Sequence, residues 1–214
     1  KNKKVNMGID VCGLNFIDKY KPFSKTLTMA RQQIHTHIKN PSTQNTYSGY
    51  CEELLIDMFG STSVESVDNS SYENATYVAD MNLPWKPPHQ YDTIIDLGTL
   101  EHIFNVPQAL NNIRNACVVG GQIIHVLPSN NFCGHGFYQF SPELFYSYYS
   151  VNNGFKNTEV FVQDLKTLEQ AYIDAPKDGQ RACVQSSGEL YVMVRTVKEI
   201  DKQVNVQQSD YVYL

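Results

Sequence analysis

Two short polar segments carry the side chains best suited to proton transfer. Glu101 and His102 are adjacent, and His135 lies between two glycines in a polar, aromatic loop that also contains Tyr138. Histidine is the natural base near neutral pH. We therefore expect His102 or His135 to take a proton from a polar alcohol, with Glu101 and Tyr138 beside them. The alternative is that 100–102 only begins a helix and that His102 is structural.

Acids end three short apolar segments, which predict strands. The segments are 63–68, 75–80 and 91–96, and their last residues are Asp68, Asp80 and Asp96. An acid at the end of a strand in a nucleotide-binding α/β fold can accept hydrogen bonds from both hydroxyls of a ribose, and Asp68 is the best candidate for this role. The alternative for Asp68 is a solvated turn, because Asn-Ser-Ser follows it.

Arg31 follows another short strand, predicted over 25–29. Its guanidinium is always charged and will not be buried without a partner. Arg31 therefore either binds the carboxylate of a ligand or pairs with a protein acid, such as Glu101 or Asp96, and fills the pocket. We favour the contact with a ligand.

The other histidines and the cysteines indicate no metal centre or disulfide framework. His125 lies inside an apolar segment and is expected to be a core residue, and His102, His125 and His135 match no metal-ligand spacing. The five cysteines contain no C-x-x-C pair, which favours reduced thiols. They are Cys12, Cys51, Cys117, Cys133 and Cys183.

Strands alternate with helices through the middle of the chain. Apolar residues at spacings of three and four predict helices over 47–58 and 106–117, and Ser-Pro-Glu at 141–143 begins another. Gly60, Gly120-Gly121 and Gly154 are expected to end these helices, and Asn105 to cap one. Residues 1–24 are predicted to be irregular. The remaining strands are predicted over 122–127, 158–162 and 189–197.

These strands are mostly continuous apolar runs, which favours an α/β fold with a mostly parallel sheet covered on both faces. The last two strands have no helix between them, so an antiparallel pair is expected to close the sheet. The predicted organisation is an N-terminal extension over 1–24, one domain over 25–200 and a C-terminal tail over 201–214.

The composition is that of a globular protein and excludes several classes of partner. The 214 residues are 42% hydrophobic and 18% charged, with a formal net charge of −5. Without a Lys/Arg block, the chain is not expected to bind nucleic acid. Without a long apolar run, a basic amphipathic stretch or a signal peptide, it is expected to be cytoplasmic and to contact no membrane. The oligomeric state stays open.

Residues 91–155 resemble class I S-adenosylmethionine-dependent methyltransferases. The segment 91–102, Tyr-Asp-Thr-Ile-Ile-Asp-Leu-Gly-Thr-Leu-Glu-His, looks like the fourth strand and following loop of that family. Residues 106–128 resemble its next helix, Gly-Gly turn and fifth strand, and 136–155 its substrate-side segment. With Asp68 and Asp80, the resemblance extends over about 25–197.

The resemblance implies a three-layer Rossmann-like fold with seven strands and S-adenosylmethionine across the ends of the first strands. It places Asp68 on the ribose, Asp80 on the adenine amino group and the backbone N–H of Met81 on a ring nitrogen. Asp96 joins the cofactor-binding set, and Glu101 and His102 lie beside the methyl donor.

The chain departs from the family after the first strand, where 28–32 reads Thr-Met-Ala-Arg-Gln in place of a glycine-rich turn. Two main hypotheses follow. The first is methyl transfer to a small polar acceptor, such as a sugar or glycan oxygen. The second is a non-catalytic binding or assembly protein in which Arg31 and its neighbours fill the cofactor site. A third, weaker hypothesis is another nucleotide-using enzyme.

Overall fold

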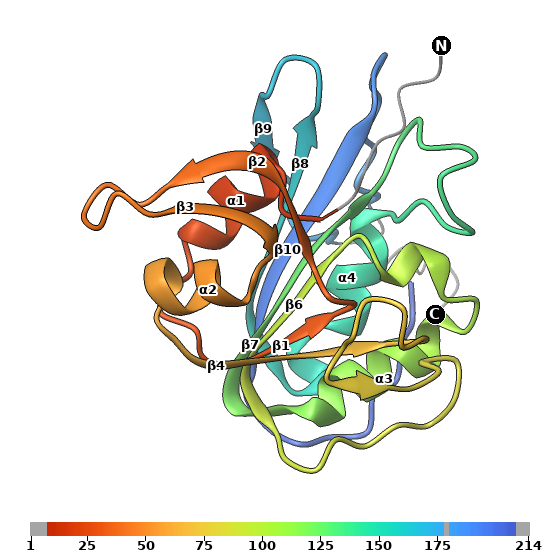
Figure 1. The fold of residues 1–214 in the computed structure, drawn as a ribbon. Coiled ribbons are helices and arrows are strands. Elements are labelled where there is room, and N and C mark those ends of the chain that lie inside the picture. Colours follow the sequence, from red (N-terminus) through yellow and green to blue (C-terminus); the bar gives the residue numbers. More distant parts are fainter. Residues whose placement is uncertain (1–7, 178–179, 209–214) are drawn as a thin grey trace.

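The computed structural model describes residues 8–177 and 180–208, and a twisted eight-stranded sheet forms its centre (Figure 1). The strands lie in the order β5-β4-β1-β6-β7-β10-β8-β9. Their bounds are β1 Ser24–Met29, β4 Ser61–Asp68, β5 Tyr77–Val78, β6 Tyr91–Leu97, β7 Cys117–Pro128, β8 Phe155–Asp164, β9 Gln170–Tyr172 and β10 Leu190–Lys198.

The pairing confirms a parallel sheet closed by antiparallel strands. Strands β5, β4, β1, β6 and β7 are parallel neighbours, while β10 runs antiparallel to both β7 and β8. The short β9 adds an antiparallel edge next to β8, so the sheet has eight strands where seven were expected.

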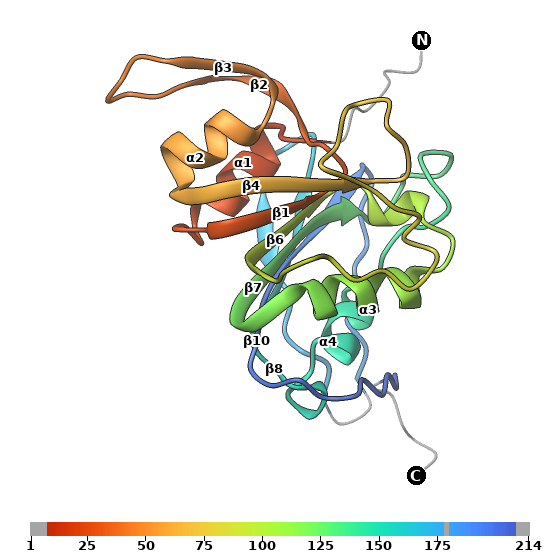
Figure 2. The same ribbon diagram turned by 60° about the horizontal axis from the view of Figure 1, so that its bottom comes forward.

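Helices cover both faces of the sheet, which makes three layers (Figure 2). Helices α1 (Val11–Asp18) and α2 (Glu52–Phe59) pack on one face, and α3 (Val106–Ala116) and α4 (Pro142–Tyr148) on the other. Two separate apolar clusters correspond to these faces. Short 3-10 turns, η1 (Leu100–His102) and η2 (Val151–Asn153), connect elements on the α3 side.

Three of the expected helix ends are confirmed by their capping contacts. The side chains of Asn105 and Ser141 accept hydrogen bonds from the N–H groups of Gln108 and Glu143, at the starts of α3 and α4. Gly60 ends α2 with φ of 71°, a left-handed conformation that glycine adopts without strain.

The segment 1–24, predicted to be irregular, contains helix α1. Asp10 caps it by accepting a hydrogen bond from Gly13 N at 2.7 Å. Phe16, Ile17 and Phe23 are fully buried in the cluster under α1 and α2. The prediction was wrong because Gly8, Gly13 and Pro22 were interpreted as breakers, although Gly13 is accommodated in the first turn of the helix.

The helix predicted over 47–58 was wrong in its first half. Residues 33–50 form a hairpin of β2 (Gln33–Lys39) and β3 (Thr46–Tyr50), which projects beyond the main sheet in Figure 1, and α2 begins only at Glu52. Tyr47 and Tyr50 have the spacing of a helix but belong to β3. Gly49, between them, has φ of 80°, which is not a helical value.

Two further boundaries differ from the prediction. Gly120 and Gly121 do not end α3, because β7 already begins at Cys117 and contains both glycines. A Cβ at Gly121 would lie 2.9 Å from the carbonyl oxygen of Asp92, so the glycine permits close approach to β6. The strand predicted over 75–80 is reduced to Tyr77–Val78.

The ends of the predicted extension and tail, 1–7 and 209–214, lie outside the described residues. Among the helices that the structure describes, none has the length and apolar character needed to cross a bilayer.

Candidate active site at the carboxyl ends of β1, β6 and β7

The sheet order reverses between β1 and β6. The chain proceeds outward from β1 to β4 and β5 on one side and from β6 to β7 on the other. In open α/β sheets, ligands bind outside the carboxyl ends of the strands at such a point. Three segments leave these ends: 30–32 after β1, 98–102 after β6 and 129–141 after β7. They carry most of the candidate residues.

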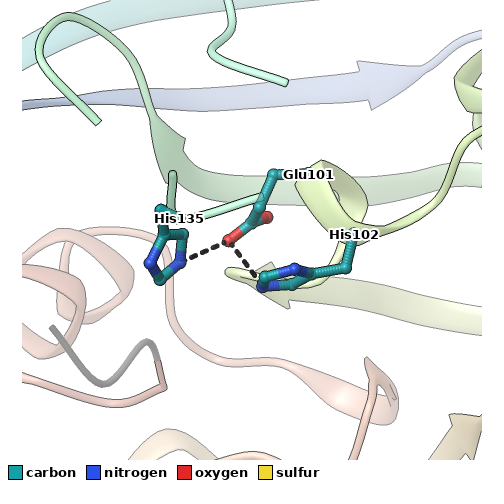
Figure 3. A group of neighbouring side chains, drawn as sticks. All are labelled: Glu101, His102 and His135. Atoms are coloured by element: carbon teal, nitrogen blue, oxygen red, sulfur yellow. Dashed lines mark ion pairs between the residues drawn. The ribbon is translucent and has the colours of Figure 1, made fainter. Parts of the chain in front are cut away.

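Glu101, His102 and His135 meet at this edge (Figure 3). Glu101 Oε1 lies 3.3 Å from His135 Nε2 and 3.6 Å from His102 Nε2. Glu101 and His102 come from η1 after β6, and His135 comes from the loop after β7. The structure therefore brings together three of the four residues expected to do chemistry.

The carboxylate of Glu101 is completely buried, and burial raises its pKa above the ordinary value for glutamate. Neither of its oxygens, nor His135 Nε2, has a hydrogen-bond partner within 8–177 and 180–208. The short contacts to the histidines do not have hydrogen-bond geometry. Buried polar atoms without partners are uncommon in folded proteins and call for an explanation, such as a ligand that completes the site.

Backbone contacts fix the loop of His135 against Glu101. The N–H groups of Phe137 and Tyr138 donate to the carbonyl oxygen of Glu101, at 2.8 and 3.3 Å. A Cβ at Gly136 would lie 2.8 Å from that same oxygen and 2.9 Å from Glu101 Cγ. Gly136 thus allows the two segments to touch, which holds His135 opposite the carboxylate.

The cluster opens to solvent beside aromatic rings. The His102 side chain is 50% exposed, whereas that of His135 is 18% exposed. Phe104 and Phe137 are exposed and meet edge to face, with ring centroids 5.8 Å apart. The hydroxyl of Tyr138, the fourth residue expected to do chemistry, donates to the carbonyl oxygen of Phe104 at 2.8 Å. Its proton is therefore already bonded to the protein.

A hollow of about 670 Å³ adjoins the loop after β7. Asn130 and Asn131 line it. Both side-chain amides donate to backbone carbonyls of 184–188, with Asn131 Nδ2 2.6 Å from Gly188 O.

Asp68 and Asp80 follow β4 and β5 at the same edge of the sheet. Asp68 is half-buried and accepts a hydrogen bond from Ser70 N at 3.2 Å. Asp80 is exposed, and hydrogen bonds from the backbone and side chain of Asn82 lower its pKa. The side chain of Met81 is buried. Contacts of these two acids with ribose and adenine stay predictions.

Asp96 does not face a cofactor. It is fully buried, and its two oxygens are bonded to Thr99 N at 3.0 Å and His125 Nδ1 at 2.9 Å. The prediction placed Asp96 in the cofactor set because it ends a strand, as Asp68 does. The side chain instead points into the core under α4. His125 is a core residue, as expected.

Arg31 pairs with a protein acid, which is the alternative that we did not favour, but the acid is neither Glu101 nor Asp96. Its guanidinium pairs with Glu52 at 2.6 Å, donates to Glu73 O at 2.9 Å and stacks over Tyr50 at 4.1 Å. The acid is Glu52 because the β2–β3 hairpin returns the chain to the end of β1, which the sequence did not reveal. Asp96 is bonded to Thr99 and His125 instead.

Two residues at this edge were missed by the sequence reasoning. The amide of Gln32 and the hydroxyl of Thr99 both donate to the carbonyl oxygen of Met29, at the carboxyl end of β1. Ala30, which directly follows Met29, has φ of 55° and adopts the left-handed turn in which glycine is normally favoured. The signal available in the sequence was Gln32, a polar residue in the segment where the family has its glycine-rich turn.

Solved structures share this arrangement of strands and helices. A phosphoethanolamine N-methyltransferase 2 from Haemonchus contortus, in complex with phosphomonomethylethanolamine and S-adenosylhomocysteine, superposes with a TM-score of 0.55 at 13% identity over 87% of this chain and 52% of that one. TehB from Haemophilus influenzae gives 0.50 at 13% identity over 89% and 62%, and YcgJ from Bacillus subtilis 0.50 at 9% over 88% and 98%. The chain has the class I methyltransferase fold.

The chain spans little more than half of the Haemonchus methyltransferase and less than two thirds of TehB. No protein-family model and no curated protein matches the sequence. The methyltransferase fold therefore rests on the topology and on these superpositions.

Proposed function

We propose that the protein binds S-adenosylmethionine and transfers its methyl group to an oxygen of a small polar acceptor. The observation that carries the proposal is the buried Glu101 with its two histidines at the switch point of a methyltransferase fold. S-adenosylmethionine would supply an electrophilic methyl group on a positively charged sulfur. The methyl group would pass to the acceptor oxygen, the electron pair of the carbon–sulfur bond would stay on sulfur, and the acceptor proton would pass to solvent, to which the cluster is open at His102.

The residues around the edge fit the two ends of this reaction. Asp68 at the end of β4 and Asp80 after β5 would bind the ribose and the adenine, and the turn at Ala30 has only a methyl side chain beside the backbone. The exposed rings of Phe104 and Phe137 can pack on an apolar face of the acceptor, such as that of a sugar ring. Binding both molecules close together would supply much of the rate enhancement.

Calorimetric titration with S-adenosylhomocysteine tests the proposal. We expect saturable binding and a weaker affinity in Asp68→Ala by roughly 10- to 100-fold, because hydrogen bonds to a charged acceptor contribute about 1.5–3 kcal/mol. Asp18→Ala is the matched control, since Asp18 is an exposed acid paired with Lys21 on the surface of α1. Candidate acceptors are then incubated with S-adenosylmethionine and examined by mass spectrometry for an added methyl group.

The second candidate is a binding or assembly protein that has lost the cofactor. The contacts that favour it are those of Arg31 with Glu52 and of Gln32 with Met29 O, where the family normally has its glycine turn. This candidate predicts no heat with S-adenosylhomocysteine at millimolar concentration. It also predicts that Arg31→Ala leaves the affinity unmeasurable and lowers only the stability.

A further inference from the structure

We propose that Glu101, His102 and His135 bind one divalent transition-metal ion at the mouth of the candidate active site. Each residue offers one ligand atom, and the three atoms lie within 4.8 Å of one another. The sequence did not reveal this site, because its ligands come from two loops and have no metal-site spacing. Metal binding itself goes beyond the proposed methyl transfer.

The separations suit ligands of a common ion. Two ligand atoms at about 2.1 Å from a metal, at tetrahedral or octahedral angles, are roughly 3.0–3.4 Å apart. Glu101 Oε1 lies 3.3 Å from His135 Nε2 and 3.6 Å from His102 Nε2. The ligand atoms of the two histidines lie within 4.8 Å of each other, so rotation of the half-exposed His102 side chain would bring all three atoms to one ion. Figure 3 shows the three side chains converging.

The hydrogen bonding of the cluster is incomplete, although Glu101 lies within ion-pair distance of both histidines. Both oxygens of Glu101 and Nε2 of His135 are buried without a hydrogen bond within the described part of the chain. A divalent cation would neutralise the buried carboxylate and satisfy these atoms together. The bonds from Phe137 N and Tyr138 N to Glu101 O hold the two ligand loops in place before an ion arrives.

The donor set indicates the class of ion. Two imidazole nitrogens and one carboxylate oxygen suit zinc, manganese, iron or cobalt, whereas magnesium and calcium prefer oxygen ligands. Three protein ligands leave coordination positions open, and the exposed side of His102 faces solvent. If the proposed methyl transfer holds, an oxygen of the acceptor would bind at one of the open positions, where the metal would polarise it. This part of the inference rests on the proposed function.

Titration of the chelator-treated full chain with Co²⁺ alone, followed by visible absorption, tests the site. We expect one ion per chain and binding weakened at least about 100-fold in Glu101→Gln and in His135→Ala, because each removes a direct ligand. His37→Ala is the matched control, because His37 is exposed on the β2–β3 hairpin, and its affinity should equal that of the wild type. Circular dichroism checks each fold. Should Glu101→Gln fail to fold, His102→Ala replaces it, because His102 is half-exposed.

The proposal would be overturned if Co²⁺ binding did not saturate, or if both ligand variants bound Co²⁺ as tightly as the wild type. An equal loss in His37→Ala would do the same. The cofactor titration separates this result from the proposed function. S-adenosylhomocysteine binding without Co²⁺ binding removes only the metal site, and Co²⁺ binding without S-adenosylhomocysteine binding removes only the methyltransferase.

Discussion

Two acid–histidine groups lie at neighbouring strand ends and differ in how completely they are bonded. In the first, Asp96 Oδ2 lies 2.9 Å from His125 Nδ1, and His125 Nε2 lies 2.7 Å from the hydroxyl of Tyr149. In the second, Glu101 is equally buried and lies close to two histidines, but neither of its oxygens has a hydrogen bond within the described residues.

The difference separates a structural group from a candidate functional one. A buried polar chain whose atoms are all paired holds its elements in one arrangement, and here it connects β6, β7 and the end of α4. A buried carboxylate without hydrogen bonds destabilises the fold by itself, and such groups are usually completed by a ligand or used in chemistry. Substitutions in the two groups should therefore have opposite effects on stability.

The largest effect is expected for His125→Ala. The substitution leaves the fully buried Asp96 with only the N–H of Thr99 and removes the partner of Tyr149. Breaking a buried acid–base pair costs about 3–5 kcal/mol. We expect the free energy of unfolding, measured by urea denaturation with chelator present, to fall by that amount.

Tyr149→Phe is the control for this first group. It removes one hydroxyl, keeps the ring between Phe145 and Phe155, and should cost about 1 kcal/mol. A loss of under 1 kcal/mol in His125→Ala would show that the Asp96 group is not a stabilising network.

An intermediate effect is expected for Gly136→Ala. The added Cβ would meet the backbone oxygen of Glu101 at 2.8 Å, so the loop must move away. Overpacking of this kind costs about 1–3 kcal/mol. The movement also separates His135 from Glu101, so Co²⁺ affinity should fall together with the urea midpoint.

Gly134→Asn is the matched control in the same loop. A Cβ there meets nothing within 4 Å, and asparagine tolerates the φ of 86° better than other residues with side chains. We expect unchanged Co²⁺ affinity in this variant. An equal loss in both would show that the loop responds to any substitution and that Gly136 has no special role.

The sequence predicted the second group better than the first. The proximity of Glu101 to His102 is visible in the sequence, and the polar loop with His135 was expected to do chemistry. The two segments meet because β6 and β7 are adjacent and parallel in the structure. The bonding of Asp96 was not predictable, because an acid at a strand end looks the same whether it faces the ligand edge or the core. The partner of Arg31 depended on long-range folding of the hairpin.

Fold prediction succeeded where local signals were redundant. The parallel strands β6 and β7 combine apolar runs with nearby turn signals, and their order follows from the alternation with helices. It failed where residues are compatible with two kinds of local structure. Gly13 suggested a break but lies in α1, and Tyr47 and Tyr50 suggested a helix but lie in β3. There, burial against the sheet decided the outcome, and a single sequence does not show which segments will be covered.

A smaller effect of opposite sign is expected for Glu101→Gln in chelated protein. The amide keeps the shape of the side chain and removes a buried charge, so we expect the variant to be about 1 kcal/mol more stable at neutral pH. Because burial raises the pKa of Glu101, the folded state holds the proton more tightly than the unfolded state. Wild-type stability should therefore fall as the pH rises from the ordinary value of 4.5 through the raised pKa.

The difference between the urea curves of wild type and Glu101→Gln should accordingly grow across this pH window and then level off. The opposite trend, with the wild type gaining on the variant as the pH rises, would mean that the carboxylate is stabilised by the protein. The second group would then resemble the first, and the contrast between them would be lost.

The smallest effect on stability is expected for His102→Ala. Half of this side chain is exposed, and its contact with Glu101 is 3.6 Å long, so its removal should change the free energy of unfolding of the chelated protein by less than about 0.5 kcal/mol. The same substitution removes one of three proposed metal ligands and should weaken Co²⁺ binding. A residue that contributes nothing to the apo fold but is needed for the ion would distinguish the second group from the first most directly, since His125 should show the reverse. Urea denaturation and Co²⁺ titration of both variants give this comparison. A large loss of stability in His102→Ala, with Co²⁺ affinity unchanged, would show that η1 is a structural turn and that His102 serves only to cover Glu101.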